Sequence, residues 1–314
     1  MTSKLSVVIP TRNRARSLLR AAASVLAQDV TALELVVVDD ASDDDTAAAL
    51  DRLAGADARV RVVRNDADPL GPCLARNRGL EVAQGELVGF CDDDDLWLPG
   101  TAAAMFDCLE AQPGLSAVSG WHLVAHAATG RRAVFRGPTR YDARQLLWQN
   151  LVAVPFGIVR RSSVPFEVRF DPDLLVAEDW DLWLRCALER PVTTVPRVSY
   201  VYTQHGGARV TVTAGAQIAA RRNFLSKYGD EMTGACRLYH ETILQGYEHG
   251  RQAMMGRLRR AGMAHPVDAA LAGATLAASK MSSRLGQRRA DPGFQARTMA
   301  SIVRRIDRRS HRAV

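Results

Sequence analysis

Four consecutive aspartates, Asp92 to Asp95, follow the apolar run 87–91 and concentrate negative charge at one point of the sequence. Carboxylates this close repel one another strongly unless they share a cation. Hard oxygen ligands select Mg²⁺ or Mn²⁺ over zinc. Alternate residues of an extended turn point the same way, so we expect Asp92 and Asp94 to face one metal ion while Asp93 contacts a ligand hydroxyl.

An isolated cluster of aspartates is commonly only an acidic surface turn. Here Gly89 and Phe90 precede the cluster, and Leu96 and Trp97 follow it. The acidic residues therefore lie between two segments that the sequence predicts to be buried. This setting favours a metal site over a solvated turn.

A second acidic pair, Asp39 and Asp40, closes a run of three valines. A carboxylate at the end of a strand can accept hydrogen bonds from a nucleobase or a ribose. The alternative is that the pair caps the following helix together with Ser42 and Asp44. We expect Asp39 to bind and the later residues to cap, with Asp40 kept among the candidate binding residues.

Two polar residues, Arg76 and Asn77, interrupt an otherwise Ala/Leu-rich helical stretch, 72–83. An arginine at this place can reach a base, a ribose or a phosphate. A solvated helical arginine is the usual alternative. We treat both residues as candidates for ligand binding.

An acidic pair also opens a predicted helix later in the chain, where Glu178 and Asp179 precede the apolar residues Trp180 and Trp183. One of these carboxylates could act as a general base toward a hydroxyl group. Acidic residues are also favoured at a helix start by the helix dipole alone. Trp180 lies beside the pair, and we place Glu178 and Trp180 in the vicinity of an acceptor or a diphosphate.

One histidine, His205, precedes two glycines that would let the backbone approach a ligand closely. Its imidazole could contact a metal ion or a diphosphate. A loop histidine without such a role is the alternative.

The elements that must position these residues alternate between short β-branched runs and Ala/Leu-rich segments. This alternation predicts a doubly wound α/β sheet that is mainly parallel and flanked by helices. In such sheets the ligand lies beyond the carboxyl ends of the strands. The predicted strands are 5–9, 33–38, 60–63 and 87–91, and the predicted helices are 15–27, 46–53 and 72–83.

Groups suited to binding rather than to packing follow each of three predicted strands. Pro10, Thr11, Arg12 and Asn13 follow the first, the pair 39–40 follows the second, and the aspartate cluster follows the fourth. We expect these groups to converge on one rim of the sheet.

The second half of the chain is less regular. Strands are predicted at 117–119, 157–160, 192–195 and 199–203, with a helix at 180–188, as an extension of the same sheet. From residue 214 the pattern is helical and Ala/Arg-rich to the end, with breaks near 266, 282–283 and 292. We expect a domain over 1–212, with halves of about 1–100 and about 101–212, and a helical basic region over 213–314.

Length and composition indicate a globular protein. The 314 residues are 47% hydrophobic, yet no apolar run approaches the ~18 to 20 residues of a membrane span. The five cysteines are scattered and lack CxxC spacing, which indicates neither a disulfide framework nor a zinc site. We therefore expect a cytoplasmic protein.

The net charge of +7 is unevenly distributed. From Arg251 onward there are 14 Lys plus Arg against three Asp plus Glu, an excess of +11 that leaves −4 for residues 1–250. Such a tail could attract nucleic acid, anionic lipid or an acidic partner, or be only a solvated helix face. We expect either contact with an anionic membrane at its inner face or a homodimer formed through the helices, and no nucleic-acid partner.

Taken in order, these motifs resemble those of family 2 glycosyltransferases of the GT-A fold. The similarity covers about residues 5–210, and five ordered motifs are far more specific than any one of them. They are Val7–Asn13, Val37–Ser42, Gly71–Gly79, Phe90–Asp95 with Pro99, and Glu178–Asp179.

The resemblance implies a transferase that takes a sugar from a nucleotide-diphosphate donor, most often a UDP-sugar. Asp92 and Asp94 would then coordinate Mn²⁺ or Mg²⁺, and Asp93 would touch the ribose or the donor sugar. Asp179 would deprotonate an acceptor hydroxyl for a displacement that inverts the anomeric centre, and His205 would lie near the diphosphate. The nucleoside would be held by Thr11, Asp39 and Arg76, with Pro10, Arg12, Asn13, Asp40 and Asn77 in the same binding region.

This sequence departs from the family's pattern at two points. Four aspartates stand where a mixed DxD motif is more usual, and the QxxRW motif and membrane spans of processive synthases are absent. The second departure implies transfer of one sugar at a time. The acceptor is expected to be a glycan, a lipid-linked sugar or a small natural product.

Three other classes fit parts of the pattern. A receiver-type signalling module would need a lysine at the site, but the only lysines are Lys4, Lys227 and Lys280. A sugar-phosphate nucleotidyltransferase would show a glycine-rich loop after the first strand, and 10–14 contains no glycine. A non-catalytic sugar-nucleotide binder stays an alternative that only an assay excludes.

Overall fold

The computed structural model describes residues 4–150, 152, 157–174, 176–205, 213–250 and 252 of the chain. The chain divides into two compact units, residues 1–206 and residues 207–314, each with its own internal packing. The first unit contains a large sheet with its flanking helices. The described part of the second unit is helical.

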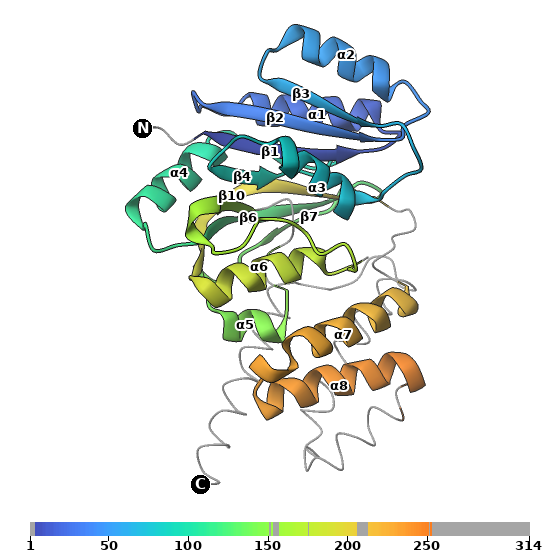
Figure 1. The fold of residues 1–314 in the computed structure, drawn as a ribbon, viewed down its shortest axis with the longest axis vertical. Helices are drawn as coiled ribbons and strands as arrows, with labels where there is room; N and C mark the ends of the chain where they lie inside the picture. The colour runs from blue at the N-terminus through green and yellow to red at the C-terminus, as the bar shows by residue number, and fades with distance from the viewer. Residues whose placement is uncertain are drawn as a thin grey trace. The chain divides into compact units, whose positions relative to one another are not determined.

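The described part of the first unit forms a ten-stranded sheet with the main order β3-β2-β1-β4-β9-β6-β10-β5, and β7 and β8 pair with β6 and β10. Figure 1 shows β3, β2, β1 and β4 following one another in this order. The strands are β1 (Leu5–Thr11), β2 (Leu33–Asp40), β3 (Val60–Asn65), β4 (Leu87–Phe90), β5 (Leu96–Trp97), β6 (Ala117–His126), β7 (Arg132–Phe135), β8 (Arg140–Tyr141), β9 (Gly157–Arg160) and β10 (Val192–Gln204). The helices are α1 (Ala15–Leu26), α2 (Thr46–Ala56), α3 (Pro72–Val82), α4 (Thr101–Ala111), α5 (Ala143–Trp148) and α6 (Glu178–Glu189).

Parallel and antiparallel pairing divide this sheet into regions. Strands β3, β2, β1 and β4 pair in parallel, as do β6 and β10. Strand β9 is antiparallel to both of its neighbours, β4 and β6. The mixed, mainly parallel α/β sheet predicted from the sequence is therefore confirmed. The strands from residue 117 onward extend the same sheet, as predicted.

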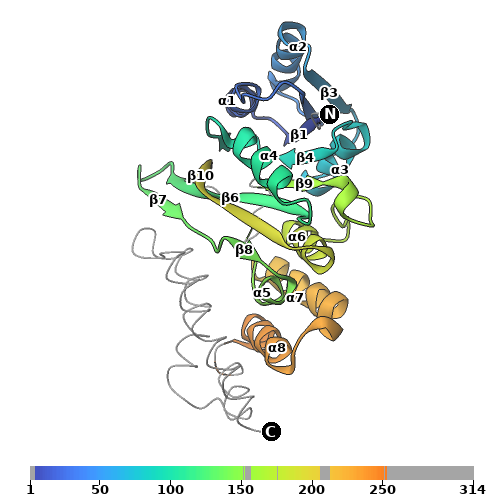
Figure 2. The same ribbon diagram turned by 90° about the vertical axis from the view of Figure 1, so that its left-hand side faces the viewer.

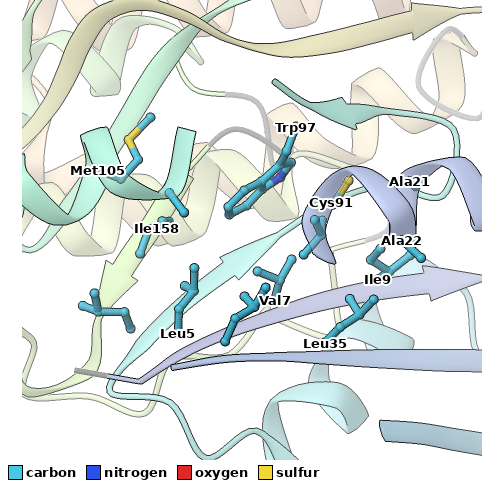
Figure 3. Close-up of a cluster of buried hydrophobic side chains, with 14 of the residues drawn as sticks. Leu5, Val7, Ile9, Ala21, Ala22, Leu35, Cys91, Trp97, Met105 and Ile158 are labelled. Atoms are coloured by element: carbon cyan, nitrogen blue, oxygen red, sulfur yellow. The ribbon is translucent and has the colours of Figure 1, made fainter. Parts of the chain in front are cut away.

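Strands β1 and β2 are buried along their whole length, as is typical of parallel strands covered on both faces. On one face Val7 and Leu35 join the hydrophobic core beneath α1 (Figure 3). On the other face Val8 and Val38 lie against Gly79 of α3. Helices α1 and α3 therefore cover opposite faces of these strands (Figure 2).

Gly79 allows α3 to approach the sheet closely, because a Cβ at this position would collide with the Val8 side chain and come within 3.0 Å of Val38 Cγ2. We expect Gly79→Ala to lower the free energy of unfolding by about 1–3 kcal/mol, the usual cost of overpacking. Urea unfolding followed by circular dichroism measures this loss.

A matched control is Gly55→Ala in α2, where a Cβ would meet nothing within 4 Å. This change should be neutral or stabilise the protein by up to about 1 kcal/mol, because alanine is the better helix former. Equal unfolding free energies for Gly79→Ala and the wild type would show that α3 can shift without cost.

Strand β10 differs from the sequence prediction of two strands at 192–195 and 199–203. It is one strand with irregular register between Val195 and Tyr200, and it pairs with β6 on both sides of that interval. Pro196 lies there, and proline has no N–H for the ladder, so the strand bulges instead of ending. The prediction of two separate strands is wrong for this reason.

In the second unit, α7 (Ala214–Tyr228) and α8 (Gly234–His249) pack through the ring of Phe224, which contacts the rings of Tyr228 and His240. The predicted helical character is thus confirmed for α7 and α8. The breaks predicted near 266, 282–283 and 292 lie outside the described residues. Among the described helices, none is both long enough and apolar enough to cross a bilayer.

Candidate active site

The aspartate cluster follows β4 and is largely enclosed. Asp93 and Asp95 are buried, whereas the side chains of Asp92 and Asp94 keep 29% and 19% of their exposure. Asp95 Oδ1 accepts a hydrogen bond of 2.8 Å from the backbone N–H of Thr203 in β10. Asp95 therefore attaches the loop to β10, and the cluster is not the solvated surface turn of the alternative interpretation.

Two segments from outside the loop contact Asp93 and Asp94. Thr11, at the end of β1, donates to Asp93 Oδ2 at 2.8 Å. Arg14 Nη1 lies 3.1 Å from Asp93 Oδ1 and 2.6 Å from Asp94 Oδ2. His205 Nε2, beyond the end of β10, lies 3.4 Å from the same Asp94 oxygen. Residues that are far apart in sequence thus meet at this loop.

Arg76 links the aspartate cluster to the start of α6. Its Nη2 donates to Asp92 at 2.6 Å and its Nη1 donates to Glu178 at 3.2 Å. The side chain is only 4% exposed, and its guanidinium carbon lies 5.5 Å from the ring centroid of Phe170. Arg76 is therefore not the solvated helical arginine that composition alone allowed.

The charge of Arg76 is secured by its partners. Burial alone would lower the pKa of Arg76, but the carboxylates of Asp92 and Glu178 raise it above its ordinary value. The guanidinium stays protonated and holds the two carboxylates on either side of it. Its buried Nε has no hydrogen-bond partner among the described residues, which leaves one donor available at this place.

Asp179 is next to Glu178 in the first turn of α6, after Ala177 with φ of 68°. Its Oδ2 accepts from Asn150 Nδ2 at 2.9 Å, and part of the side chain is exposed. Burial raises the pKa of Asp179 to about 7, and the negative charge of Glu178 adds to the rise. A carboxylate with this pKa can both take and release a proton near neutral pH.

The pKa of Asp93 is also shifted from its ordinary value. Burial raises its pKa to about 6, and the neighbouring charges of Asp94 and Asp92 act in the same direction. Arg14 and the Thr11 hydroxyl oppose the rise because they stabilise the carboxylate. Asp93 and Asp179, the two carboxyls with raised pKa values, each adjoin in sequence a partner of Arg76. Perturbed carboxyls cluster at functional sites.

Three of the predicted binding residues form bonds that shape the loops. Asp39 Oδ1 accepts from the backbone N–H of Ser42 at 3.2 Å. Asp40 accepts from the backbone N–H groups of Leu70 and Gly71 at 2.9 and 2.8 Å, which fixes the entry to α3. Asn13, with φ of 54°, donates to Asp43 at 2.6 Å and joins the loops after β1 and β2.

The remaining candidates lie in different settings. Asn77 exchanges two hydrogen bonds with the backbone of Phe170, at 2.8 and 2.7 Å, and so ties α3 to the segment before α6. Trp180 is buried and donates to the Leu146 carbonyl in α5. Pro10 is buried within β1, and Arg12 is exposed beyond it.

Two residues at the site, Arg14 and Asn150, were not among the residues predicted from the sequence. Arg14 stands in the loop after the first predicted strand, and a cation so placed could have been paired with the aspartate cluster. Asn150 follows α5 and lies 29 residues before Asp179. Nothing in its local sequence marks it.

The donor set fits Mn²⁺ or Mg²⁺ in chemistry. Among the described residues, no group of three or more His, Cys, Asp or Glu side chains is arranged to hold a metal. Such ions commonly take only one or two protein carboxylates, with phosphate oxygens and water completing the shell. The partly exposed Asp92 and Asp94 are two carboxylates that could act in this way.

The chain is similar to known proteins in sequence and in fold. Residues 6–165 match the protein family described as "Glycosyl transferase family 2". The succinoglycan biosynthesis protein ExoO of Rhizobium meliloti is 27% identical over 85% of this chain and 81% of its own length.

Solved structures extend the similarity to most of the chain. TarS of S. aureus, in complex with UDP-GlcNAc, gives a TM-score of 0.63 at 19% identity over 79% of this chain and 74% of that one. The mannosyltransferase PcManGT of Pyrobaculum calidifontis, in complex with GDP-Man and Mn²⁺, gives 0.58 at 22% identity over 98% and 88%. These likenesses confirm the fold expected from the motifs.

Proposed function

The chain belongs to glycosyl transferase family 2 and is a nucleotide-sugar glycosyltransferase, and from this premise we propose that it transfers one sugar at a time from a UDP-sugar to an acceptor hydroxyl with inversion. The observation that carries this proposal is the position of Arg76. Its guanidinium joins Asp92 of the aspartate loop to Glu178 at the start of α6. This contact supports a single site for the proposed donor-binding loop and for the proposed base, Asp179, which follows Glu178 in the chain.

In this mechanism Asp179 is the general base. As the acceptor oxygen forms its bond to the anomeric carbon, the hydroxyl proton passes to the Asp179 carboxylate, and the bond from that carbon to the diphosphate breaks. A single displacement of this kind inverts the anomeric centre because the leaving group departs from the opposite face. Positioned proton transfer contributes about 10² to 10⁴ in rate.

The donor would be held by the loops at the carboxyl ends of β1, β2 and β4. We assign the nucleoside to Thr11, Asp39 and Arg76, with Pro10, Arg12, Asn13 and Asn77 in the surrounding wall. Asp40 supports this wall through its bonds to the loop before α3. Asp93 would contact the ribose or the sugar, and His205 would lie near the diphosphate.

We further propose that Asp92 and Asp94 hold a divalent cation, Mn²⁺ or Mg²⁺. When bound, such an ion supplies charge neutralisation to the leaving diphosphate. The hard oxygen atoms of the two partly exposed carboxylates support this assignment. PcManGT was solved in complex with GDP-Man and Mn²⁺.

Residues of about 101–212 would form the acceptor half, and residues of about 1–100 the donor half. The relative ExoO is named for succinoglycan biosynthesis, which supports a glycan or a lipid-linked sugar as acceptor over a small natural product. Contact of the basic region with a membrane, or its pairing in a homodimer, stays a prediction.

A donor screen tests the proposal. The purified protein is incubated with Mn²⁺ and each of several UDP- and GDP-sugars, with and without cell extract as a source of acceptor, and release of the nucleoside diphosphate is measured. We expect release above background from a UDP-sugar, and EDTA should abolish it. Release only from a GDP-sugar would contradict the choice of nucleotide, and release that persists in EDTA would contradict the metal.

The raised pKa of Asp179 predicts the pH dependence of transfer. Because the base must be deprotonated, kcat/KM should rise with pH through about 7 and level off above it. Removing the Asn150 hydrogen bond in Asn150→Ala destabilises the carboxylate and should move this midpoint up by roughly one pH unit. A profile measured from pH 5.5 to 9.5 checks both expectations, and an identical midpoint in the variant would remove Asn150 from this role.

A further inference from the structure

The side chain of Arg14 contacts the carboxylates of both Asp93 and Asp94, the two middle residues of the aspartate loop, residues 92–95. One of its nitrogens, Nη1, lies 3.1 Å from Asp93 Oδ1 and 2.6 Å from Asp94 Oδ2. The Asp94 oxygen that it contacts is also the one nearest to His205, at 3.4 Å. An oxygen that we assign to metal binding is thus already bonded to a protein cation.

Two arginines share the charge of the aspartate loop. Arg76 pairs with Asp92, and Arg14 pairs with Asp93 and Asp94. Without these cations the adjacent carboxylates would repel one another strongly at such short range. Pairing with arginine therefore lets the loop fold before any divalent ion binds.

The two arginines differ in how easily their guanidinium groups can separate from the carboxylates that they contact. Arg76 is 4% exposed and is held between Asp92 and Glu178. The side chain of Arg14 is 48% exposed, so its guanidinium can turn into water and be hydrated there. Asp93 would keep its hydrogen bond from Thr11 when Arg14 moves away.

We propose that Arg14 is the counter-ion of Asp94 in the metal-free protein and that a divalent cation must displace it from Asp94 in order to bind. This inference rests on the proposed metal site and deepens it. Arg14 and the ion compete for the same oxygen, so the presence of Arg14 weakens metal binding. The same contact stabilises the loop when no metal is present.

The test compares Arg14→Gln with the wild type in two measurements that need no activity. The first is titration with Mn²⁺ alone, in which electron paramagnetic resonance reports the free ion. We expect Arg14→Gln to bind Mn²⁺ roughly 3- to 10-fold more tightly, the scale of one partly exposed charged hydrogen bond. The second is thermal unfolding in EDTA, where the variant should melt at a lower temperature than the wild type.

Arg16→Gln is the matched control, because it removes the same charge from an exposed position in α1. It should match the wild type in both measurements, which excludes a general effect of net charge. Arg14→Lys keeps a cation near Asp94 and should restore most of the stability in EDTA, together with the weaker Mn²⁺ binding. Restoration by lysine also answers the concern that the glutamine variant folds poorly.

The outcomes separate this inference from the metal assignment. If Arg14→Gln binds Mn²⁺ as tightly as the wild type or more weakly, Arg14 does not compete with the ion for Asp94. The assignment of the metal site would then still hold. If the wild type and Arg14→Gln both fail to bind Mn²⁺, with and without UDP, the metal assignment and the displacement both fall.

Discussion

Asp179→Asn is expected to reduce the rate of sugar transfer by about 10²- to 10⁴-fold at pH 8 while donor binding stays close to that of the wild type. The amide cannot accept the proton of the acceptor hydroxyl, so the nucleophile is no longer activated. Because the residue keeps its size and its place in α6, the donor loops are not disturbed. Single-turnover transfer with saturating donor, together with calorimetry of UDP binding, measures the two effects separately.

The stability of the same variant provides its internal check. The pKa of Asp179 is raised in the folded protein, to about 7, so the carboxyl favours the fold while it is protonated. That contribution is lost as the pH rises through about 7, and the wild type carries an unfavourable, partly buried charge at pH 8. Asp179→Asn should therefore be at least as resistant to urea as the wild type at pH 8.

The control for Asp179→Asn is Asp173→Asn, an identical change at an exposed aspartate shortly before α6. It should leave transfer unchanged. Transfer at the wild-type rate in a folded Asp179→Asn variant would show that another group takes the proton.

Asp94→Ala is expected to lower transfer by about 10²- to 10³-fold and to abolish its dependence on Mn²⁺, the scale on which loss of one stabilising group acts at a charged transition state. The variant removes one of the two carboxylates assigned to the metal. It should stay folded, because Asp95, and not Asp94, bonds the loop to β10. Transfer measured against Mn²⁺ concentration, with the far-ultraviolet circular dichroism spectrum, tests both parts.

Asp51→Ala is the matched control for Asp94→Ala. Asp51 is an exposed aspartate in α2 that pairs with Arg64, so its loss removes the same charge without touching the loop. Its transfer activity should equal that of the wild type. If Asp94→Ala keeps a wild-type response to Mn²⁺, the ion is held elsewhere.

Much of the fold could be predicted from local patterns. The buried runs that became β1 and β2 are continuous and β-branched, and a strand covered on both faces needs such a run. The first three helices begin at the predicted residues, 15, 46 and 72, and α6 begins at Glu178, the first residue of the acidic pair. The prediction of strands was wrong where one residue perturbs a longer element, as Pro196 does in β10. A proline in a local sequence pattern predicts the end of a strand, whereas β10 continues past it.

The residue types of the site were also readable from the sequence, because their position after strands is a local property. Thr11 and the aspartates 92–94 follow such runs, and the rule that parallel strands end at one rim brings them together. The hydrogen bond between Thr11 and Asp93 bears out that convergence for the ends of β1 and β4.

The sequence by itself determined the α/β sheet, the order of its motifs and the carboxylates that end its strands, since each depends on residues that are close together in the chain. Only the tertiary structure decided which charges are paired. It placed Arg76 between Asp92 and Glu178, Arg14 on Asp94, and Asn150 on Asp179. These contacts join residues that are 16 to 102 positions apart, and a side chain's partner and burial are set by packing in space, which no local pattern encodes.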